Sequence, residues 1–383
     1  MNFEKYLVKL TPLDYFFFGG ENTFGGRDGS QSNYLVRSQY YPQQTALLGL
    51  VRHQLLLQNG LLVNDQITNH QEAALLIGER SFYHSEGANP SFGAIRSLTG
   101  LMYARRDDFY FPAGRTYGYD PDTNTLKKLK LTQQAGLPLL KDYSEKGGVL
   151  NLLGAKGKNK LMTYEEHLLE NIDSCYLSKR QQGIHKNYQG KTEEKAYFIQ
   201  TVFKLTSDCA FAFVVELATT VPGTSKPVQL QSQRMVRFGG EQSTFRMEVT
   251  PFQGEVEKQY PVYEADAHYH QIILLSDAYL PEYVPGQSAY FANTAITDFR
   301  CLQTEVRHTS NYATLGAKSS ASQRPVYKSK KLSLLQRGSV FYGKDHQSLE
   351  SLAASLEKET AFRTIGYNQY VTVPAPAPAS SAG

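Results

Sequence analysis

Residues 226–249 read KPVQLQSQRMVRFGGEQSTFRMEV, a run that predicts a helix, a glycine turn and a strand in succession. We expect the helix over residues 228–236 and the start of the strand at Thr244. Between them, Gly239 and Gly240 allow positive φ and have no Cβ to obstruct a ligand, and Arg237 lies beside them. This turn is suited to backbone contact with an acidic polymer, although a helix C-cap followed by a tight turn has the same pattern.

The rest of the chain favours strands over helices, as in an α+β fold. One amphipathic helix is expected at residues 44–58, where Leu47, Leu48, Val51 and Leu55 share a face. A second helix is expected at residues 163–172. Strands are expected at residues 4–13, 197–205, 211–217, 271–275, 298–306 and 340–342, with several short ones in residues 79–111. The strands at 197–205 and 211–217 are expected to form a hairpin.

The bulk composition allows a large, weakly basic protein. A chain of 383 residues exceeds what one hydrophobic core usually fills, so two domains are expected. The 40 Lys and Arg outnumber the 36 Asp and Glu by only four. Such a balanced chain binds nucleic acid only if its positive charges are gathered on one surface.

The sequence offers no sign of secretion, membrane insertion or a bound cofactor. The three cysteines have no spacing typical of a zinc site or a disulfide framework, which favours a reducing compartment. No signal peptide and no apolar run of membrane-spanning length is present, so we expect a cytoplasmic protein. Residues 24–29 lack the glycine spacing of a dinucleotide site, and we expect no small-molecule substrate.

Cations beside aromatic rings or glycines are the candidates for contact with an acidic partner. Local pairs place Arg27 near Phe24, Arg37 near Tyr34, Arg52 near His53, and Arg237 near Phe238. A glycine-rich connection at residues 141–160 carries Lys156, Lys158 and Lys160, and residues 179–188 carry Lys179, Arg180, His185 and Lys186. Rings of this kind are often buried, and such lysines are often only solvated.

Six short motifs in order resemble a known family. They are LTPLDYFFFGG at 10–20, YP at 41–42 leading into LLGLVR at 47–52, GIHK at 183–186, FGGE at 238–241, GSVFY at 338–342, and IGYN at 365–368. In this order, over nearly the whole chain, they resemble the third subunit of the Cmr complex, the type III-B CRISPR effector. The sequence departs from that pattern after the aromatic segment, where Glu21 and Asn22 stand in place of an arginine and the first cation is Arg27.

The resemblance implies a RAMP-superfamily protein with two ferredoxin-like, RRM-like domains that face each other across a cleft and carry long insertions. The expected parts are an N-terminal domain at 1–155, a connection and basic hairpin at 156–196, a C-terminal domain at 197–373, and a Pro/Ala tail at 374–383. It also implies a non-catalytic subunit for antiviral defence. This subunit would bind the 5′ tag end of the guide (CRISPR) RNA and bridge the large cyclase-like subunit to the backbone subunits.

These arguments yield one set of candidate RNA-binding residues and one catalytic alternative. The set is Arg27, Arg37, Arg52, Lys156, Lys158, Lys179, Arg180, His185, Lys186, Arg237, Gly239 and Gly240. The alternative is a RAMP-family endoribonuclease that processes CRISPR precursor RNA, which commonly needs a histidine at the scissile phosphate. His53, His84 and His185 show no triad or metal spacing, and His268 with His270 lacks an identifiable third metal ligand.

Overall fold

The computed structural model describes most of the chain. The described residues are 2–19, 35–79, 82, 90–106, 108–120, 125–134, 137–141, 161–162, 168–169, 175–186, 192–240, 242–281, 289–299, 302–303, 327–328, 331–345 and 347–376. Strands predominate and helices are few, which confirms a mixed α and β protein. None of the helices reported below has both the length and the apolar character needed to cross a membrane.

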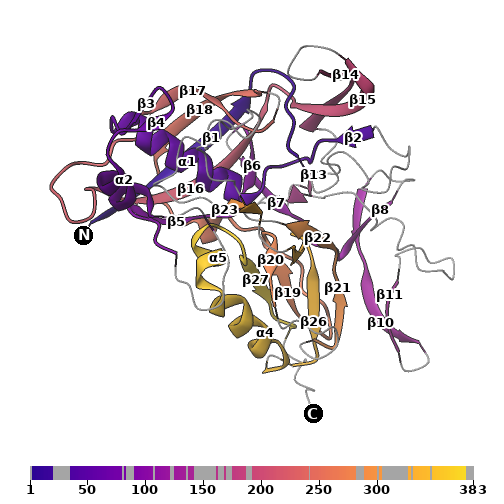
Figure 1. The fold of residues 1–383 in the computed structure, drawn as a ribbon. Helices are drawn as coiled ribbons and strands as arrows, with labels where there is room; N and C mark the ends of the chain where they lie inside the picture. Colours follow the sequence, from indigo (N-terminus) through magenta and orange to yellow (C-terminus); the bar gives the residue numbers. More distant parts are fainter. Residues whose placement is uncertain are drawn as a thin grey trace.

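A nine-stranded sheet forms the centre of the molecule (Figure 1). Its order is β13 (Leu168–Leu169), β12 (Leu161–Met162), β7 (Asp108–Pro112), β6 (Met102–Arg105), β16 (Cys209–Ala218), β1 (Phe3–Pro12), β18 (Thr244–Pro251) and β17 (Gln233–Arg237), and β5 (Ile95–Leu98) also pairs with β16. The predicted first strand is thus confirmed. It lies between β16 and β18, where Val8 and Leu10 are buried in the core.

Two helices pack on this core. Helix α1 (Gln44–Gln58) confirms the predicted helix and buries Leu47 and Leu55. Helix α2 (His70–Ile77) was not expected. The Asn69 side chain caps its N-terminus by accepting hydrogen bonds from the backbone N of Gln71 and Glu72. Both helices lie beside the small hairpin of β3 (Leu62–Val63) and β4 (Gln66–Ile67) (Figure 1).

A long hairpin extends away from the central sheet (Figure 1). Its strands are β14 (Tyr176–Lys186) and β15 (Thr192–Leu205), and β2 (Leu35–Arg37) pairs in parallel with β15. The hairpin predicted from residues 197–205 and 211–217 is wrong, because β15 and β16 belong to different sheets. The turn between them is held by Thr206, whose backbone N donates to the carbonyl of Cys175 at 2.9 Å.

The C-terminal part forms a second layer. Its four-stranded sheet has the order β21 (Phe291–Asn293), β26 (Val340–Gly343), β19 (His270–Leu274) and β27 (Tyr370–Val373), and α4 (Gln347–Lys358) and α5 (Thr360–Thr364) lie beside it (Figure 1). A three-stranded sheet combines β20 (Ala278–Tyr279), β25 (Leu332–Leu335) and β22 (Ile296–Phe299). The remaining elements are β8 (Tyr117–Asp120), β9 (Thr125–Lys128), β10 (Lys130–Gln134), β11 (Leu137–Lys141), η2 (Val256–Gln259), β23 (Leu302–Gln303) and β24 (Tyr327–Lys328).

Two predicted helices are corrected by the structure. The helix expected at 228–236 is wrong: an extended segment enters strand β17, which pairs with β18. Asn59, at the end of α1, holds this segment by exchanging two hydrogen bonds of 3.2 Å with the backbone of Gln229. The helix expected at 163–172 is wrong at strand β13, and its other residues lie outside the described part of the chain.

Some strands pair across the expected domain boundaries, which stay a prediction. Strand β1, in the expected domain 1–155, pairs with β16 and β18 from the expected domain 197–373. The expected boundary at residue 197 also falls inside β15. The two facing ferredoxin-like domains stay a prediction, and of the tail at 374–383 only residues 374–376 are described.

Candidate nucleic-acid interface

The glycine turn packs closely against the aromatic segment near the N-terminus. The backbone N of Gly240 donates to the carbonyl of Phe17 at 2.7 Å, and Gly239 has a φ of +90°. A Cβ added at Gly239 would lie 2.8 Å from the Phe17 carbonyl oxygen. Ser243 closes the turn, since its Oγ donates to the Gly240 carbonyl at 2.6 Å and accepts from the Phe17 backbone N at 3.2 Å. Close backbone approach within the protein therefore accounts for Gly239, whereas a Cβ added at Gly240 would lie 3.1 Å from a carbon of the Phe17 ring.

The aromatic segment itself belongs to the core. Phe16 and Phe18 are buried, with ring centroids 4.7 Å apart. Phe16 exchanges backbone hydrogen bonds of 2.6 and 3.1 Å with Phe203 of β15. The segment thus connects the base of the hairpin to the glycine turn. Phe238, expected beside Arg237 as a stacking ring, is buried as well.

Two exposed arginines lie on one face of the hairpin sheet. Arg180 on β14 stands opposite Thr201 on β15, and Thr201 stands opposite Arg37 on β2. Residues in direct register share a face, and neighbouring strands lie about 4.8 Å apart, so the two arginine backbones are about 10 Å apart. We call Arg180, Thr201 and Arg37 the arginine row. It gathers two positive charges that lie far apart in sequence.

The guanidinium of Arg37 is oriented by aromatic rings. Its central carbon lies 5.1 Å from the ring centroid of Tyr40 and 5.4 Å from that of Phe203. Its Nη2 donates to the Tyr40 hydroxyl at 2.5 Å. The Tyr40 ring in turn stacks on Phe203, with centroids 4.7 Å apart. A cation held over rings in this way keeps its charge at the surface while losing little further side-chain freedom on binding.

A lysine lies on the opposite face of the hairpin base. Lys179 is in register with Val202, and its Nζ lies 5.5 Å from the ring centroid of Tyr15. Tyr15 is half-buried and packs against Phe17 and Val202. The base of the hairpin therefore presents cations on both faces, each beside a tyrosine ring.

The other predicted residues divide into three groups. Arg52 is only 3% exposed, and its Nη2 donates to the Ser91 carbonyl at 3.4 Å, so its prediction as an RNA contact is wrong. Arg237 is exposed at the end of β17. His185 and Lys186 end strand β14, but their side chains lie outside the described part, as do the residues Arg27, Lys156 and Lys158.

The structure describes the surroundings of two of the candidate histidines. Burial lowers the pKa of His53. The Nδ1 of His270 accepts a hydrogen bond from the Ala375 backbone N at 3.2 Å. Among the described residues, no group of three metal-ligating side chains comes together.

Comparison with known proteins identifies the family. The family described as CRISPR-associated protein (Cas_Cmr3) matches residues 8–375. This chain belongs to the Cas_Cmr3 family. The match confirms the resemblance to the third subunit of the type III-B Cmr complex, and with it the assignment to type III CRISPR effectors. No match was found among curated proteins.

Solved structures of low identity are also similar to this Cas_Cmr3 chain. One is a chain in the cryo-EM structure of the Type III-B Cmr-beta bound to cognate target RNA and AMPPnP, with 12% identity, 96% of each chain covered and a TM-score of 0.46. A second, Cmr-beta bound to cognate target RNA, has 12% identity, the same coverage and a TM-score of 0.44. A third, the Csm1-Csm4 cassette in complex with AMPPNP, has 10% identity, 88% and 87% coverage, and a TM-score of 0.34.

Sequence reasoning missed the residues that join the predicted ones. Thr201 lies between the two arginines, and Tyr40 and Tyr15 lie beneath cations. Tyr40 is only three residues after Arg37, so its ring could have been paired with that arginine from the sequence. Nothing local indicated that the segment containing Thr201 pairs with β2, because the two strands lie far apart in sequence.

Proposed function

We propose that this Cas_Cmr3 protein is a non-catalytic subunit that binds the 5′ tag end of the guide RNA. In this role it bridges the large cyclase-like subunit to the backbone of the type III-B effector in antiviral defence. The observation that carries the proposal is the arginine row, which places Arg37 and Arg180 on one exposed face of the hairpin sheet. Two cations at this spacing suit the phosphates of a single strand.

The chemistry would combine charge neutralisation with stacking. Single-stranded RNA is commonly held by cations along its backbone and by bases stacked on rings or guanidinium planes. Arg37 supplies a guanidinium oriented over Tyr40, and Lys179 with Tyr15 offers a similar pair on the other face. The glycine turn then has an indirect part, since it holds the aromatic segment on which the hairpin base rests.

The test compares guide RNAs with and without the 5′ tag. Each is bound to the assembled effector that contains either the wild-type chain or the double variant Arg37→Ala, Arg180→Ala. We expect the variant to lose most of the affinity that depends on the tag, while tagless RNA binds the two assemblies alike. Equal binding of tagged RNA by both assemblies, or an equal loss for both RNAs, would contradict the proposal.

A matched control is Arg96→Ala. Arg96 is also exposed and lies 4.6 Å from the ring centroid of Phe3, but it stands on β5 and pairs with Glu216 at 3.5 Å. Its removal takes away one positive charge, as each of the single variants Arg37→Ala and Arg180→Ala does, without touching the arginine row, so tag-dependent binding should be unchanged. The same preparations incubated with precursor RNA test the catalytic alternative: cutting that disappears in His185→Ala would favour the endoribonuclease.

A further inference from the structure

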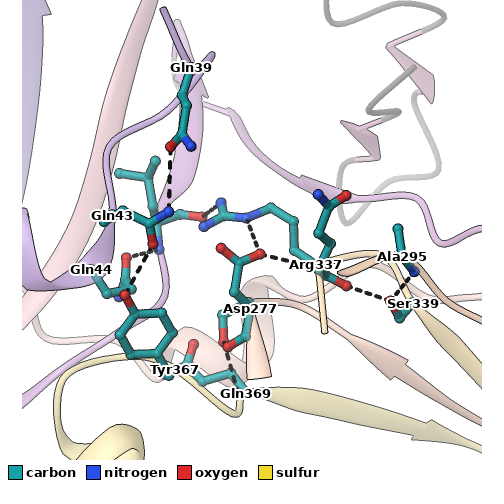
Figure 2. A network of polar contacts seen from close by, with 12 residues as sticks. Gln39, Gln43, Gln44, Asp277, Ala295, Arg337, Ser339, Tyr367 and Gln369 are labelled. Carbon is teal, nitrogen blue, oxygen red and sulfur yellow. Dashed lines mark hydrogen bonds and ion pairs between the residues drawn. The ribbon is translucent and has the colours of Figure 1, made fainter. Parts of the chain in front are cut away.

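A buried arginine of the C-terminal layer contacts the segment that leads to the arginine row. Arg337 follows strand β25, and its side chain is 5% exposed. Its Nη1 donates to the Leu101 carbonyl at 3.2 Å, and its central carbon lies 3.9 Å from the ring centroid of Tyr41. Figure 2 shows the Asp277 carboxylate beside it, with 3.6 Å between Oδ1 and Nε. The same oxygen accepts the Arg337 backbone N at 2.8 Å.

Tyr41 belongs to residues 38–43, the linker between β2 and α1. The C-terminal layer also holds the last residue of this linker and the first residue of α1. The Tyr367 hydroxyl donates to Gln43 Oε1 at 3.2 Å, and Gln43 Nε2 donates to Gln39 Oε1 at 3.4 Å (Figure 2). Gln44 Nε2 donates to the Ile365 carbonyl at 2.9 Å. Three contacts from the C-terminal layer thus fix the second half of the linker and the start of α1.

The other half of the linker is bound to the hairpin base. The backbone N of Ser38 donates to the Thr201 carbonyl at 2.8 Å, and Ser38 Oγ accepts the backbone N of Phe18 at 2.8 Å. The Tyr40 carbonyl accepts the Tyr176 hydroxyl at 2.5 Å. Adjacent residues are therefore held by different parts of the protein, Tyr40 by the hairpin and Tyr41 by Arg337.

We propose that Arg337 is a positioning residue for RNA binding at the arginine row, acting through Tyr41 and the linker on Arg37. The inference rests on the proposed function and adds to it that the C-terminal layer sets the geometry of the RNA-binding face. Arg37 stands at the end of a short strand, directly before the linker. A shift of Tyr41 is therefore transmitted to the adjacent Tyr40, over whose ring the Arg37 guanidinium lies.

The contact requires a guanidinium rather than a positive charge alone. A planar guanidinium can stack on Tyr41 while its edge donates to the Leu101 carbonyl and faces Asp277. The ammonium of a lysine can keep the charge opposite Asp277 but cannot stack over the ring in the same way. Arg337→Lys therefore preserves a buried counter-charge for Asp277 and loosens the contact with the linker.

The experiment is a double-mutant cycle on the assembled effector with tagged guide RNA. Its members are wild type, Arg337→Lys, Arg37→Ala and the double variant. We expect Arg337→Lys to weaken tagged RNA binding by about three- to tenfold, the range of a lost cation–ring contact. In the Arg37→Ala background the same change should have almost no further effect. Independent multiplication of the two losses would overturn the inference, because Arg337 would then not act through Arg37.

Matched controls separate positioning from a general loss of folding. Arg96→Lys also removes a guanidinium from a ring and from a carboxylate partner, but it touches neither the linker nor the arginine row, and it should leave RNA binding unchanged. Tyr41→Leu removes the ring without altering a charge and should reproduce the loss seen with Arg337→Lys. It serves as the second variant if Arg337→Lys unfolds, as judged by circular dichroism. Wild-type affinity in folded Tyr41→Leu would also overturn the inference.

The cycle distinguishes the two proposals. Unchanged binding in Arg37→Ala would refute the proposed function and leave no binding geometry for Arg337 to set. Reduced binding in Arg37→Ala, together with wild-type affinity in Arg337→Lys, would keep the proposed function and refute the positioning role alone.

Discussion

Replacement of Gly239 by alanine tests why the glycine turn has this sequence. The residue has a φ of +90°, and an added Cβ would lie 2.8 Å from the Phe17 carbonyl oxygen and 3.0 Å from two carbons of the Phe18 ring. Neither neighbour can easily move, because one is backbone and the other is a buried ring. We expect the substitution to destabilise the protein through both backbone strain and this close contact.

A second glycine separates the two contributions. Gly223 also has positive φ, at +75°, but a Cβ there would meet nothing within 4 Å. Strain alone should cost about 1 to 2 kcal/mol in Gly223→Ala. The added contact at Gly239 should cost about 1 to 3 kcal/mol more, as in other overpacked sites. The expected total for Gly239→Ala is therefore about 2 to 5 kcal/mol.

In the assay, urea unfolding is monitored by circular dichroism. The slope of the unfolding free energy against urea concentration is compared among the variants. An unchanged slope shows that the midpoints report stability. Gly239→Ala should unfold at clearly lower urea than Gly223→Ala. Equal midpoints for the two variants would refute the reasoning, because the approach of the turn to Phe17 would then contribute nothing to stability.

Three further predictions concern the salt dependence of RNA binding, stability in acid and a buried tyrosine. Loss of both Arg37 and Arg180 should reduce the slope of log affinity against log salt by about 1.4, since each neutralised phosphate of a single strand contributes about 0.7, so the advantage of wild type should shrink about sevenfold between about 50 and about 200 mM salt. The hydrogen bond from Arg105 lowers the pKa of Asp208 to about 2. This interaction stabilises the fold above the unfolded pKa of about 4, and the stabilisation is lost as the pH falls towards 2. Over that pH range, the unfolding free energy of wild type should fall further than that of Asp208→Asn, by about 1 kcal/mol or less. Tyr176→Phe should lower the free energy of urea unfolding by about 1 to 3 kcal/mol, because the half-buried Tyr40 carbonyl and the buried Tyr103 hydroxyl each lose a hydrogen-bond partner.

Local sequence patterns predicted the elements whose conformation depends little on tertiary contacts. Helix α1 repeats its apolar positions with helical spacing over a long window, and β1 mixes apolar and polar positions as a strand does before Pro12 ends it, so both were identified. The extended segment before β17 was misassigned because its apolar residues fit either period, and pairing with β18 and contact with Asn59 decided between them. Propensity is a weak guide where such tertiary contacts compete.

The residue types of the candidate site could be predicted from the sequence, but their arrangement in space could not. The cations of residues 179–188 and Arg37 were found because charge beside glycine, amide or aromatic residues suits an acidic polymer. Their common face depends on parallel pairing of β2 with β15, which no local pattern encodes. Arg52 shows the opposite error: it lies off the apolar stripe of α1, yet Ser91 and Phe92 cover it from another part of the chain.

The linker at residues 38–43 follows one arginine and contacts another, and the two should respond differently to substitution. Arg37 is exposed, so its removal should alter RNA binding with little effect on folding, as for most surface charges. Arg337 is buried opposite Asp277, so its removal leaves a buried carboxylate without its counter-charge and should affect folding strongly. Stability and affinity measured on the same variants therefore separate the residue that contacts RNA from the residue that positions it. If Arg337→Ala lowers stability, folded Arg337→Lys lowers affinity, and Arg37→Ala lowers affinity alone, the linker couples the fold of the C-terminal layer to the binding face.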